Sequence, residues 1–206
     1  MVVRFLLCAF MTLWPASIGP TAALAATGAA HWPRQAMIRV WIDLRDEPPA
    51  GDRLVERAMQ TWTTASDRRL TLLRTLIRDE ADVHVFFVRG GGNYGETLPH
   101  VNGSTGLIDR ADVAIAAFVP GDEVTRQIVA YLTALHELGH AIGLEHTTTF
   151  SDIMYLFRRP DDGPRYFSAY RSLLRTAADI GTAAATGLSP ADVQALRDLY
   201  DDKDGR

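Results

Sequence analysis

The first regular pattern along the chain is an alternation of apolar and polar residues over residues 37 to 43, MIRVWID. A period of two with β-forming residues predicts a strand, which Pro48-Pro49-Ala50-Gly51 ends. From Asp52 to Ala65 the apolar period becomes that of a helix, and Asp52 stands where it can cap the first turn. A long amphipathic helix is predicted there, with these residues toward the core: Leu54, Val55, Ala58, Met59 and Trp62.

Short apolar runs predict further strands later in the chain. Leu70 to Leu73 is one, and Val83 to Val88 is another, whose nearly continuous apolar run indicates a central position in a sheet. His84 within that run is interpreted as a hydrogen-bonded structural histidine. Gly106 to Ile108 and Asp112 to Phe118 supply two more strands, so the sheet is expected to have about five strands in all.

Loops and helices make up the rest of the pattern. Gly90 to Gly95 is interpreted as a surface loop and not as a phosphate-binding loop, because no Gly-Lys-Ser or Gly-Lys-Thr follows it. Arg126 to Leu144 has apolar residues at helical spacing and predicts a second long helix. After the turn-rich stretch Arg158 to Gly163, an alanine-rich run predicts another helix around Tyr170 to Thr186.

Residues 136 to 146, within the second long helix and its end, read HELGHAIGLEH. His136 and His140 are four residues apart, so their imidazoles leave the same helix face and can reach one metal ion. Gly143 allows the chain to leave the helix through a positive φ, and the turn brings His146 round as a third ligand. Glu137 projects beside the metal, where it can take a proton from a bound water without binding the ion itself.

Three protein ligands leave the fourth tetrahedral position open for water, which is the coordination of a catalytic zinc. Neutral imidazoles leave the site its full +2 charge, so the pKa of the bound water should fall from about 15.7 towards about 7. A lone HExxH pattern also occurs by chance on amphipathic helices, but here half of the six histidines in the chain lie within eleven residues. The segment therefore predicts one catalytic zinc ion, with Glu137 as the general base.

The pattern HExxHxxGxxH, followed by a methionine turn, resembles the metzincin clan of metallopeptidases. Ser151-Asp152-Ile153-Met154-Tyr155 stands where that turn is expected, with Met154 eight residues past His146. The resemblance implies that Met154 lies beneath the zinc site as an apolar floor and is not a ligand. Thr147 and the pair Met154-Tyr155 are similar to the matrixins, the matrix-metalloproteinase-like branch of the clan.

Other parts of the chain resemble the matrixin catalytic domain as well. His31-Trp32-Pro33-Arg34 with the following MIRVWI is similar to its start, and Leu188 to Tyr200 is similar to its last helix. The resemblance implies an α+β fold: a twisted mixed sheet of about five strands with an antiparallel edge strand, a long backing helix, an active-site helix and a C-terminal helix. It also implies that the strand at Gly106 to Ile108 is that edge strand and binds an extended peptide by strand addition.

The chain departs from the matrixin pattern in three respects. Its only cysteine is Cys8, which excludes the family's cysteine-switch latency. In the stretch where matrixins bind a second, structural zinc, only His84 and His100 are available, so one zinc ion is expected; calcium on backbone carbonyls near Gly90 to Gly95 stays open. Residues 158 to 187 form a longer connection than the family's specificity loop, either a wall of the cleft or a passive surface insertion.

The methionine turn also bears on which residues are assigned a catalytic role. A tyrosine that assists catalysis in relatives lies two residues past the methionine, and that position here is Leu156. Tyr155 is therefore given no catalytic role.

Residues 1 to 25 predict a signal peptide. Arg4 precedes the apolar run Phe5 to Trp14, and Ala23-Leu24-Ala25 has the small residues that signal peptidase requires. The alternative, a permanent membrane anchor, needs a run of about 20 apolar residues, whereas Pro15 already interrupts this one. Residues 26 to 206 are then the catalytic domain of a secreted or periplasmic protein that has no integral membrane anchor and no disulfide.

Composition limits the class of function. The chain has 206 residues, of which 47% are apolar and 22% charged, and this suits one globular domain. Its net charge of −4 gives no support for a nucleic acid as partner, and a monomer acting on a protein or peptide substrate is expected. The prediction is an exported zinc endopeptidase. The alternatives are a zinc amidase or other hydrolase of a non-protein substrate, and an exported binding module with a catalytically silent site.

Overall fold

The computed structural model describes residues 29–90 and 93–201. The predicted signal peptide, residues 1–25, lies outside the described residues, as does part of the Gly90–Gly95 stretch considered for calcium. Within the described ranges, no helix combines the length and the apolar character that crossing a membrane requires.

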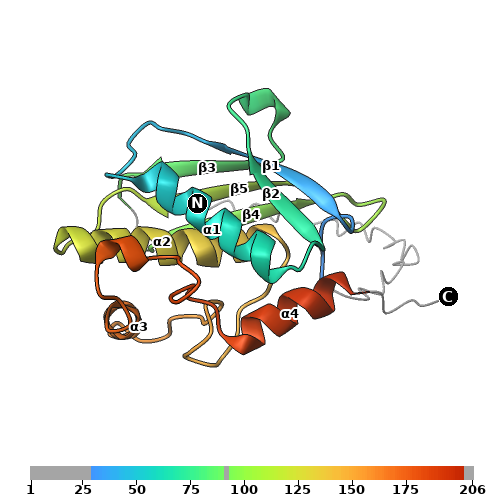
Figure 1. Ribbon diagram of the computed structural model, residues 1–206. Helices are drawn as coiled ribbons and strands as arrows, with labels where there is room; N and C mark the ends of the chain where they lie inside the picture. The colour runs from blue at the N-terminus through green and yellow to red at the C-terminus, as the bar shows by residue number, and fades with distance from the viewer. Residues whose placement is uncertain (1–28, 91–92, 202–206) are drawn as a thin grey trace, which may run out of the picture.

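A five-stranded mixed sheet forms one layer of the fold (Figure 1). Its strands lie in the order β2-β1-β3-β5-β4, and β4 alone is antiparallel to its neighbour. The predicted mixed sheet with an antiparallel edge strand is confirmed. In chain order the strands are β1 Ala36–Ile42, β2 Leu70–Arg74, β3 Val83–Val88, β4 Gly95–Val101 and β5 Ile108–Ala116.

The identity of the edge strand differs from the prediction. Gly106 to Ile108 was expected at the edge, but this stretch leads into β5, and β4 occupies the edge instead. The β4 sequence GETLPHV contains a glycine and a proline, which disfavour strands, and its strand conformation comes from pairing with β5. Pro99 is tolerated because an edge strand has one side without a partner strand.

Two long helices, α1 (Gly51–Ala65) and α2 (Glu123–Ala141), lie on the same side of the sheet (Figure 1). The predicted core residues of α1 are buried, and the fully buried Trp62 donates its indole N–H to the carbonyl of Leu135 on α2. The expectation that Asp52 caps α1 is wrong. The helix is preceded by Ala50 in the left-handed region, and the Asp52 carboxylate pairs with Arg74.

The segment after the methionine turn contributes to the core. It forms α3 (Asp162–Arg171) and a short 3-10 helix (Ala177–Asp179), with Tyr166, Phe167 and Tyr170 of α3 buried. The helix predicted around Tyr170 to Thr186 is therefore wrong. The helix forms where the aromatic residues are, because their side chains can bury more apolar surface than a run of alanines.

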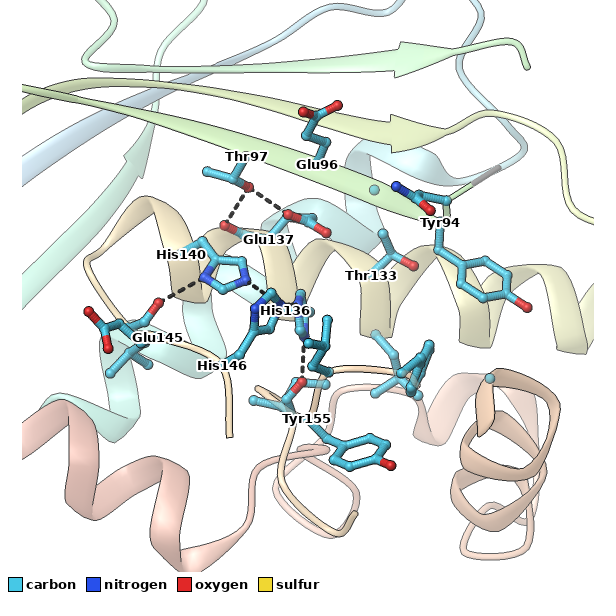
Figure 2. Close-up of a pocket in the computed structure, with 18 of the residues that line it drawn as sticks. Tyr94, Glu96, Thr97, Thr133, His136, Glu137, His140, Glu145, His146 and Tyr155 are labelled. Atoms are coloured by element: carbon cyan, nitrogen blue, oxygen red, sulfur yellow. Dashed lines mark hydrogen bonds between the residues drawn. The ribbon is translucent and has the colours of Figure 1, made fainter. Parts of the chain in front are cut away.

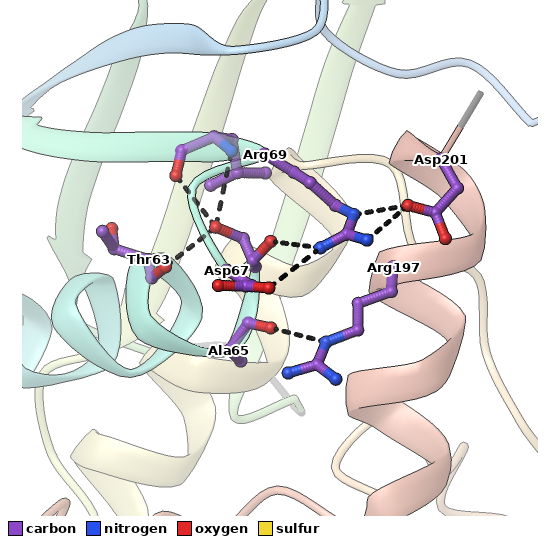
Figure 3. Close-up of polar contacts among 8 residues, drawn as sticks. Thr63, Ala65, Asp67, Arg69, Arg197 and Asp201 are labelled. Atoms are coloured by element: carbon purple, nitrogen blue, oxygen red, sulfur yellow. Dashed lines mark hydrogen bonds and ion pairs between the residues drawn. The ribbon is translucent and has the colours of Figure 1, made fainter.

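The last helix, α4 (Pro190–Tyr200), is fixed to the turn that joins α1 to β2 (Figure 3). Arg197 donates to the carbonyl of Ala65 at the end of α1, and the guanidinium of Arg69 pairs with Asp201, with 2.6 Å between Nε and Oδ1. Ser189 begins the helix with a reciprocal cap, in which its hydroxyl accepts from the backbone N–H of Asp192 and its own N–H donates to the Asp192 carboxylate.

Both ends of the described chain meet at the C-terminal end of α2. The indole N–H of Trp32 donates to the carbonyl of Ala141 at 2.8 Å, and the hydroxyl of Tyr200 donates to the carbonyl of Ile142 at the same distance. The backbone N–H of Trp32 in turn donates to the Tyr200 hydroxyl. These bonds satisfy carbonyls that the end of a helix leaves without partners, and they fix the part of α2 that carries the histidines.

Candidate metal centre

His136 and His140 project from the same face of α2, and His146 approaches them from the loop that follows (Figure 2). The Nε2 atom of His146 lies 3.3 Å from Nε2 of His136 and 3.1 Å from Nε2 of His140. Within the described ranges, these three residues are the one group of His, Cys, Asp or Glu side chains with the spacing of metal ligands. The three predicted ligands are therefore brought together around one point.

Backbone carbonyls fix the orientation of two of these rings. Nδ1 of His136 lies 2.6 Å from the carbonyl oxygen of Ile153, and Nδ1 of His140 lies 2.8 Å from that of Leu144. An imidazole that donates its Nδ1–H to a carbonyl has its lone pair on Nε2. Both rings consequently present an unprotonated nitrogen to the common point, as metal-binding histidines with an outer hydrogen bond do.

Burial favours the uncharged state of all three rings. It lowers the pKa of His136 to about 4, against a smaller opposing effect from the hydrogen bond to Ile153. Burial also lowers the pKa values of His140 and His146. At neutral pH the three imidazoles are neutral, which is the form that binds a metal ion.

A glycine makes the turn that returns the chain to His146. Gly143 has a φ of 98°, which L side chains rarely adopt, and a Cβ built on it would lie 2.3 Å from the carbonyl oxygen of Ala30. Beyond the turn, the backbone N–H of Thr147 donates to the carbonyl of Met154. This bond holds the loop that carries His146 against the methionine turn.

The methionine turn lies under the three histidines and is tied to the last helix. The side chain of Met154 is buried, with 2% of its surface exposed. The backbone N–H of Ile153 donates to Oδ2 of Asp192 at 2.9 Å, and the Ser189 hydroxyl donates to Asp152. Helix α4 therefore supports the same residue, Ile153, whose carbonyl orients His136.

Glu137 lies beside the histidines but outside the group with ligand spacing. Thr97 of the edge strand β4 reaches it: Oγ1 of Thr97 lies 2.7 Å from Oε2 of Glu137 and 3.0 Å from its main-chain oxygen (Figure 2). Burial raises the pKa of Glu137 to about 7, and the Thr97 hydrogen bond opposes this rise. A carboxylate whose pKa lies close to neutrality can both take up and return a proton.

The histidines and Glu137 open into a cavity of about 1100 Å³. One wall is aromatic: the ring centroid of Tyr94 lies 4.9 Å from that of Phe167 on α3 and 6.1 Å from that of Phe157. The cavity exceeds the usual size of a small-molecule pocket, about 300–1,000 Å³, and the edge strand β4 borders it. Such a cleft has room for an extended chain with one side chain placed against the aromatic wall.

His84 and His100 meet elsewhere, on the other face of the sheet from α2. Nδ1 of His84 lies 3.2 Å from Oδ1 of Asp112, and Nε2 of His100 lies 2.8 Å from Oδ2 of the same carboxylate. The other nitrogen of His84 lies 3.2 Å from the carbonyl of Arg78, which confirms the interpretation of His84 as a hydrogen-bonded structural residue. The guanidinium of Arg110 lies 3.3 Å from His100, so this cluster already contains a cation.

Sequence reasoning missed two residues of these clusters, Thr97 and Asp112. Thr97 lies in a segment that was not recognised as a strand, and its contact with Glu137 joins residues 40 positions apart. Asp112 was placed in a predicted strand, but only the register of β3 against β5 brings it opposite His84. No local pattern marks either contact.

Comparison with known proteins agrees with this geometry. The family model described as Matrixin matches residues 44–166, more than half of the chain. The chain is 28% identical over 110 residues to interstitial collagenase of Oryctolagus cuniculus, an alignment that covers 50% of this chain and 23% of that protein. It is 29% identical over 119 residues to matrix metalloproteinase-20 of Homo sapiens, covering 50% and 22% respectively.

The matched region thus spans about a quarter of the length of these relatives. The residues that the family model matches include the three convergent histidines, the methionine turn and strands β2 to β5, whereas β1 lies before them. Fold, site geometry and family match agree, and the chain belongs to the matrixin family of the metzincin clan.

Proposed function

We propose that this protein is an exported zinc-dependent endopeptidase that hydrolyses internal bonds of a protein or extended peptide. One observation carries the proposal: Nε2 of His146 lies within 3.3 Å of Nε2 of both His136 and His140, and the buried carboxylate of Glu137 lies beside these three imidazoles. The names of the relatives, interstitial collagenase and matrix metalloproteinase, agree with it.

The residues present fit a catalytic zinc ion. Three nitrogen donors, two of them oriented by carbonyls through Nδ1, form the set that binds zinc and leaves one coordination position open. A zinc ion held by His136, His140 and His146 would supply a Lewis acid for the scissile carbonyl and would lower the pKa of a water molecule. We expect one such ion per chain.

Glu137 moves the protons in this proposal. It takes a proton from the attacking water at its free carboxylate oxygen, and the carboxyl group then donates that proton to the nitrogen of the leaving amine. Both transfers use the same carboxyl group, which is buried beside the histidines and held in place by the Thr97 hydroxyl. Glu137 is a base and not a ligand here, since it lies outside the group with ligand spacing.

The edge strand β4 holds the substrate backbone in this proposal. The backbone N–H of Ala116 donates to the carbonyl of Tyr94, so alternate residues from Tyr94 onward point their backbone groups at β5. The residues between them, Gly95, Thr97 and Pro99, point theirs at the free edge. An extended peptide can pair there by strand addition, although Pro99 offers only its carbonyl.

The proposal also includes export from the producing cell, and the exported protein is proposed to act as a monomer. Export is supported by the leader pattern of residues 1 to 25, with cleavage near Ala26 and no membrane anchor in the mature protein. The secreted or periplasmic protein would then act on extracellular or envelope proteins.

A proteolysis assay on the purified mature protein tests the proposal. Casein should be cleaved with zinc bound, and cleavage should stop when a chelator removes the metal. Glu137→Ala should keep its zinc and lose activity by about 10²- to 10⁴-fold, the usual size of a general acid–base contribution. Glu145→Ala, which removes an exposed carboxylate one residue before His146, is the matched control and should remain active.

The same assay separates the alternatives. Wild-type turnover by Glu137→Ala would contradict the mechanism. Chelator-sensitive hydrolysis of a non-protein amide without proteolysis would favour an amidase, and zinc binding without any hydrolysis would favour a silent binding module.

A further inference from the structure

Two residues of the edge strand face Glu137 directly. Gly95 and Thr97 are two positions apart on β4, so their side-chain positions lie on the same face of the sheet, and that face is turned toward α2. A Cβ built on Gly95 would lie 2.7 Å from both Cγ and Oε1 of Glu137. Gly95 therefore leaves the space that one side of the carboxylate occupies.

Thr97 holds the other side of that carboxylate. Its hydroxyl oxygen lies 2.7 Å from Oε2 of Glu137, an ordinary distance for an O–H···O hydrogen bond, and 3.0 Å from the main-chain oxygen of the same residue. No side chain in the described part of the molecule donates to Oε1. One oxygen of the base is thus fixed by the strand, and the other is left for a water molecule.

The backbone of Thr97 meets the free edge of the sheet. In the register of β4 with β5, Thr97 lies opposite Val113 between two hydrogen-bonded positions, so its N–H and C=O point away from β5. The same residue consequently presents its main chain to the place where a peptide would pair and its side chain to the general base.

We propose that Thr97 is a positioning residue that holds Glu137 in the orientation needed for proton transfer and links that orientation to the strand on which the substrate is bound. The role rests on the proposed peptidase function. Glu137 is carried by a flexible three-bond side chain, and without a fixed partner its carboxylate can rotate away from the water. A displacement of about 1 Å at a reacting group is enough to cost roughly 10²-fold in rate.

Replacement by an isosteric residue without the hydroxyl tests the proposal. Thr97→Val should lower kcat by about ten- to a hundredfold, while KM for a peptide substrate changes by less than about twofold and zinc content is unchanged. Thr97→Ser, which keeps the hydroxyl, should restore kcat to within about threefold. Thr71→Val on β2, a half-buried threonine outside the cleft, is the matched control.

A second measurement does not depend on activity. In crystal structures of the metal-free protein, the Glu137 carboxylate should leave its place beside Gly95 in Thr97→Val and keep it in Thr97→Ser. A Thr97→Val variant with the wild-type kcat, or an equal loss in the valine and serine variants, would overturn the proposal. So would an unmoved carboxylate in Thr97→Val. If the wild-type protein cleaves no peptide, the proposed function fails, and the position of the carboxylate still decides the role of Thr97.

Discussion

Gly139 and Met154 are in close contact beneath the three convergent histidines. A Cβ built on Gly139 would lie 2.5 Å from Sδ of Met154 and 3.2 Å from an indole carbon of Trp62. Real Cβ atoms do not approach other atoms so closely, so any larger residue must displace the methionine or the helix. The glycine between the two histidines of α2 is thus required by the floor of the site.

Gly139→Ala should therefore lower both the thermal stability and the zinc affinity. The extra methyl group overpacks the core, which costs about 1–3 kcal/mol in typical proteins, and it moves the turn whose carbonyl orients His136. Thermal unfolding with and without zinc measures both effects. Gly103→Ala is the control, because nothing lies within 4 Å of its added Cβ. Equal melting temperatures for Gly139→Ala and wild type would contradict the packing argument.

Metal analysis of the mature protein should return about one zinc ion per chain. His146→Ala should bind zinc much more weakly, because two imidazoles on a helix face cannot replace a three-ligand site. Glu145→Ala serves as the neighbouring control and should bind zinc like the wild type. Two tightly held zinc ions in the wild type would show that His84, His100 and Asp112 bind a metal despite the guanidinium of Arg110 beside them.

Tyr94→Ala should change which peptides are cut while zinc content stays the same. The Tyr94 ring fills the gap above Gly163, where a Cβ would lie 2.8 Å from it, and it forms part of the aromatic wall of the cavity. Removal of the Tyr94 ring enlarges the cavity at that wall. A peptide library should therefore show a shift of cleavage toward peptides with larger side chains at this position. Phe118→Ala, at an aromatic residue that is 77% exposed, is the control.

The test with Tyr94→Ala is valid only if the variant melts within a few degrees of the wild type. An unchanged library profile from such a variant would refute the inference that Tyr94 affects which peptides are cut. Deletion of residues 158 to 187 is a poorer test. It would remove Tyr166, Phe167 and Tyr170 from the core and unfold the domain.

Asp192 should give the protein a distinctive pH dependence of stability. Burial raises the pKa of this carboxyl, and the charge of Asp152 adds to the rise. The folded state then binds the proton more tightly than the unfolded state, so this group favours folding as the pH falls and opposes it near neutrality. Asp192→Asn stays neutral at every pH and can still accept the two backbone hydrogen bonds.

Urea unfolding of Asp192→Asn and wild type at pH 7 and at about pH 4 checks this. The variant's free energy of unfolding, relative to wild type, should be higher at pH 7 than at the acid pH. Asp198→Asn, on the same helix but hydrogen-bonded only at the surface to Gln194, should show no such difference. A relative stability of Asp192→Asn that is the same at both pH values would contradict the assignment.

The histidine motif and the long helices could be read from the sequence because their determinants are local. His136 and His140 share a face through the helical period alone, and Gly143 marks the end of the helix by its conformational freedom. Trp62 was assigned to the core from the same periodicity. Each of these inferences needs only a few neighbouring residues.

The edge strand could not be recognised in the same way. Gly95 and Pro99 disfavour a strand, and β4 forms because β5 offers it hydrogen-bonding partners. The role inferred for Thr97 depends on that pairing, so no inspection of its neighbours would have found it. The alanine-rich stretch shows the reverse error: helix propensity favoured it, but Gly181 has a φ of 72° and the aromatic residues of α3 had already taken the buried surface.

The bonds from Trp32 and Tyr200 to the end of α2 have a consequence for biosynthesis. A growing chain that has passed Tyr155 already contains every histidine of the site, but it lacks Tyr200 and Asp192. Until α4 leaves the ribosome, the end of α2 and the carbonyl that orients His136 are held by fewer bonds. Domains fold as cooperative units, so the site of the three histidines should be completed only when nearly the whole polypeptide has been made.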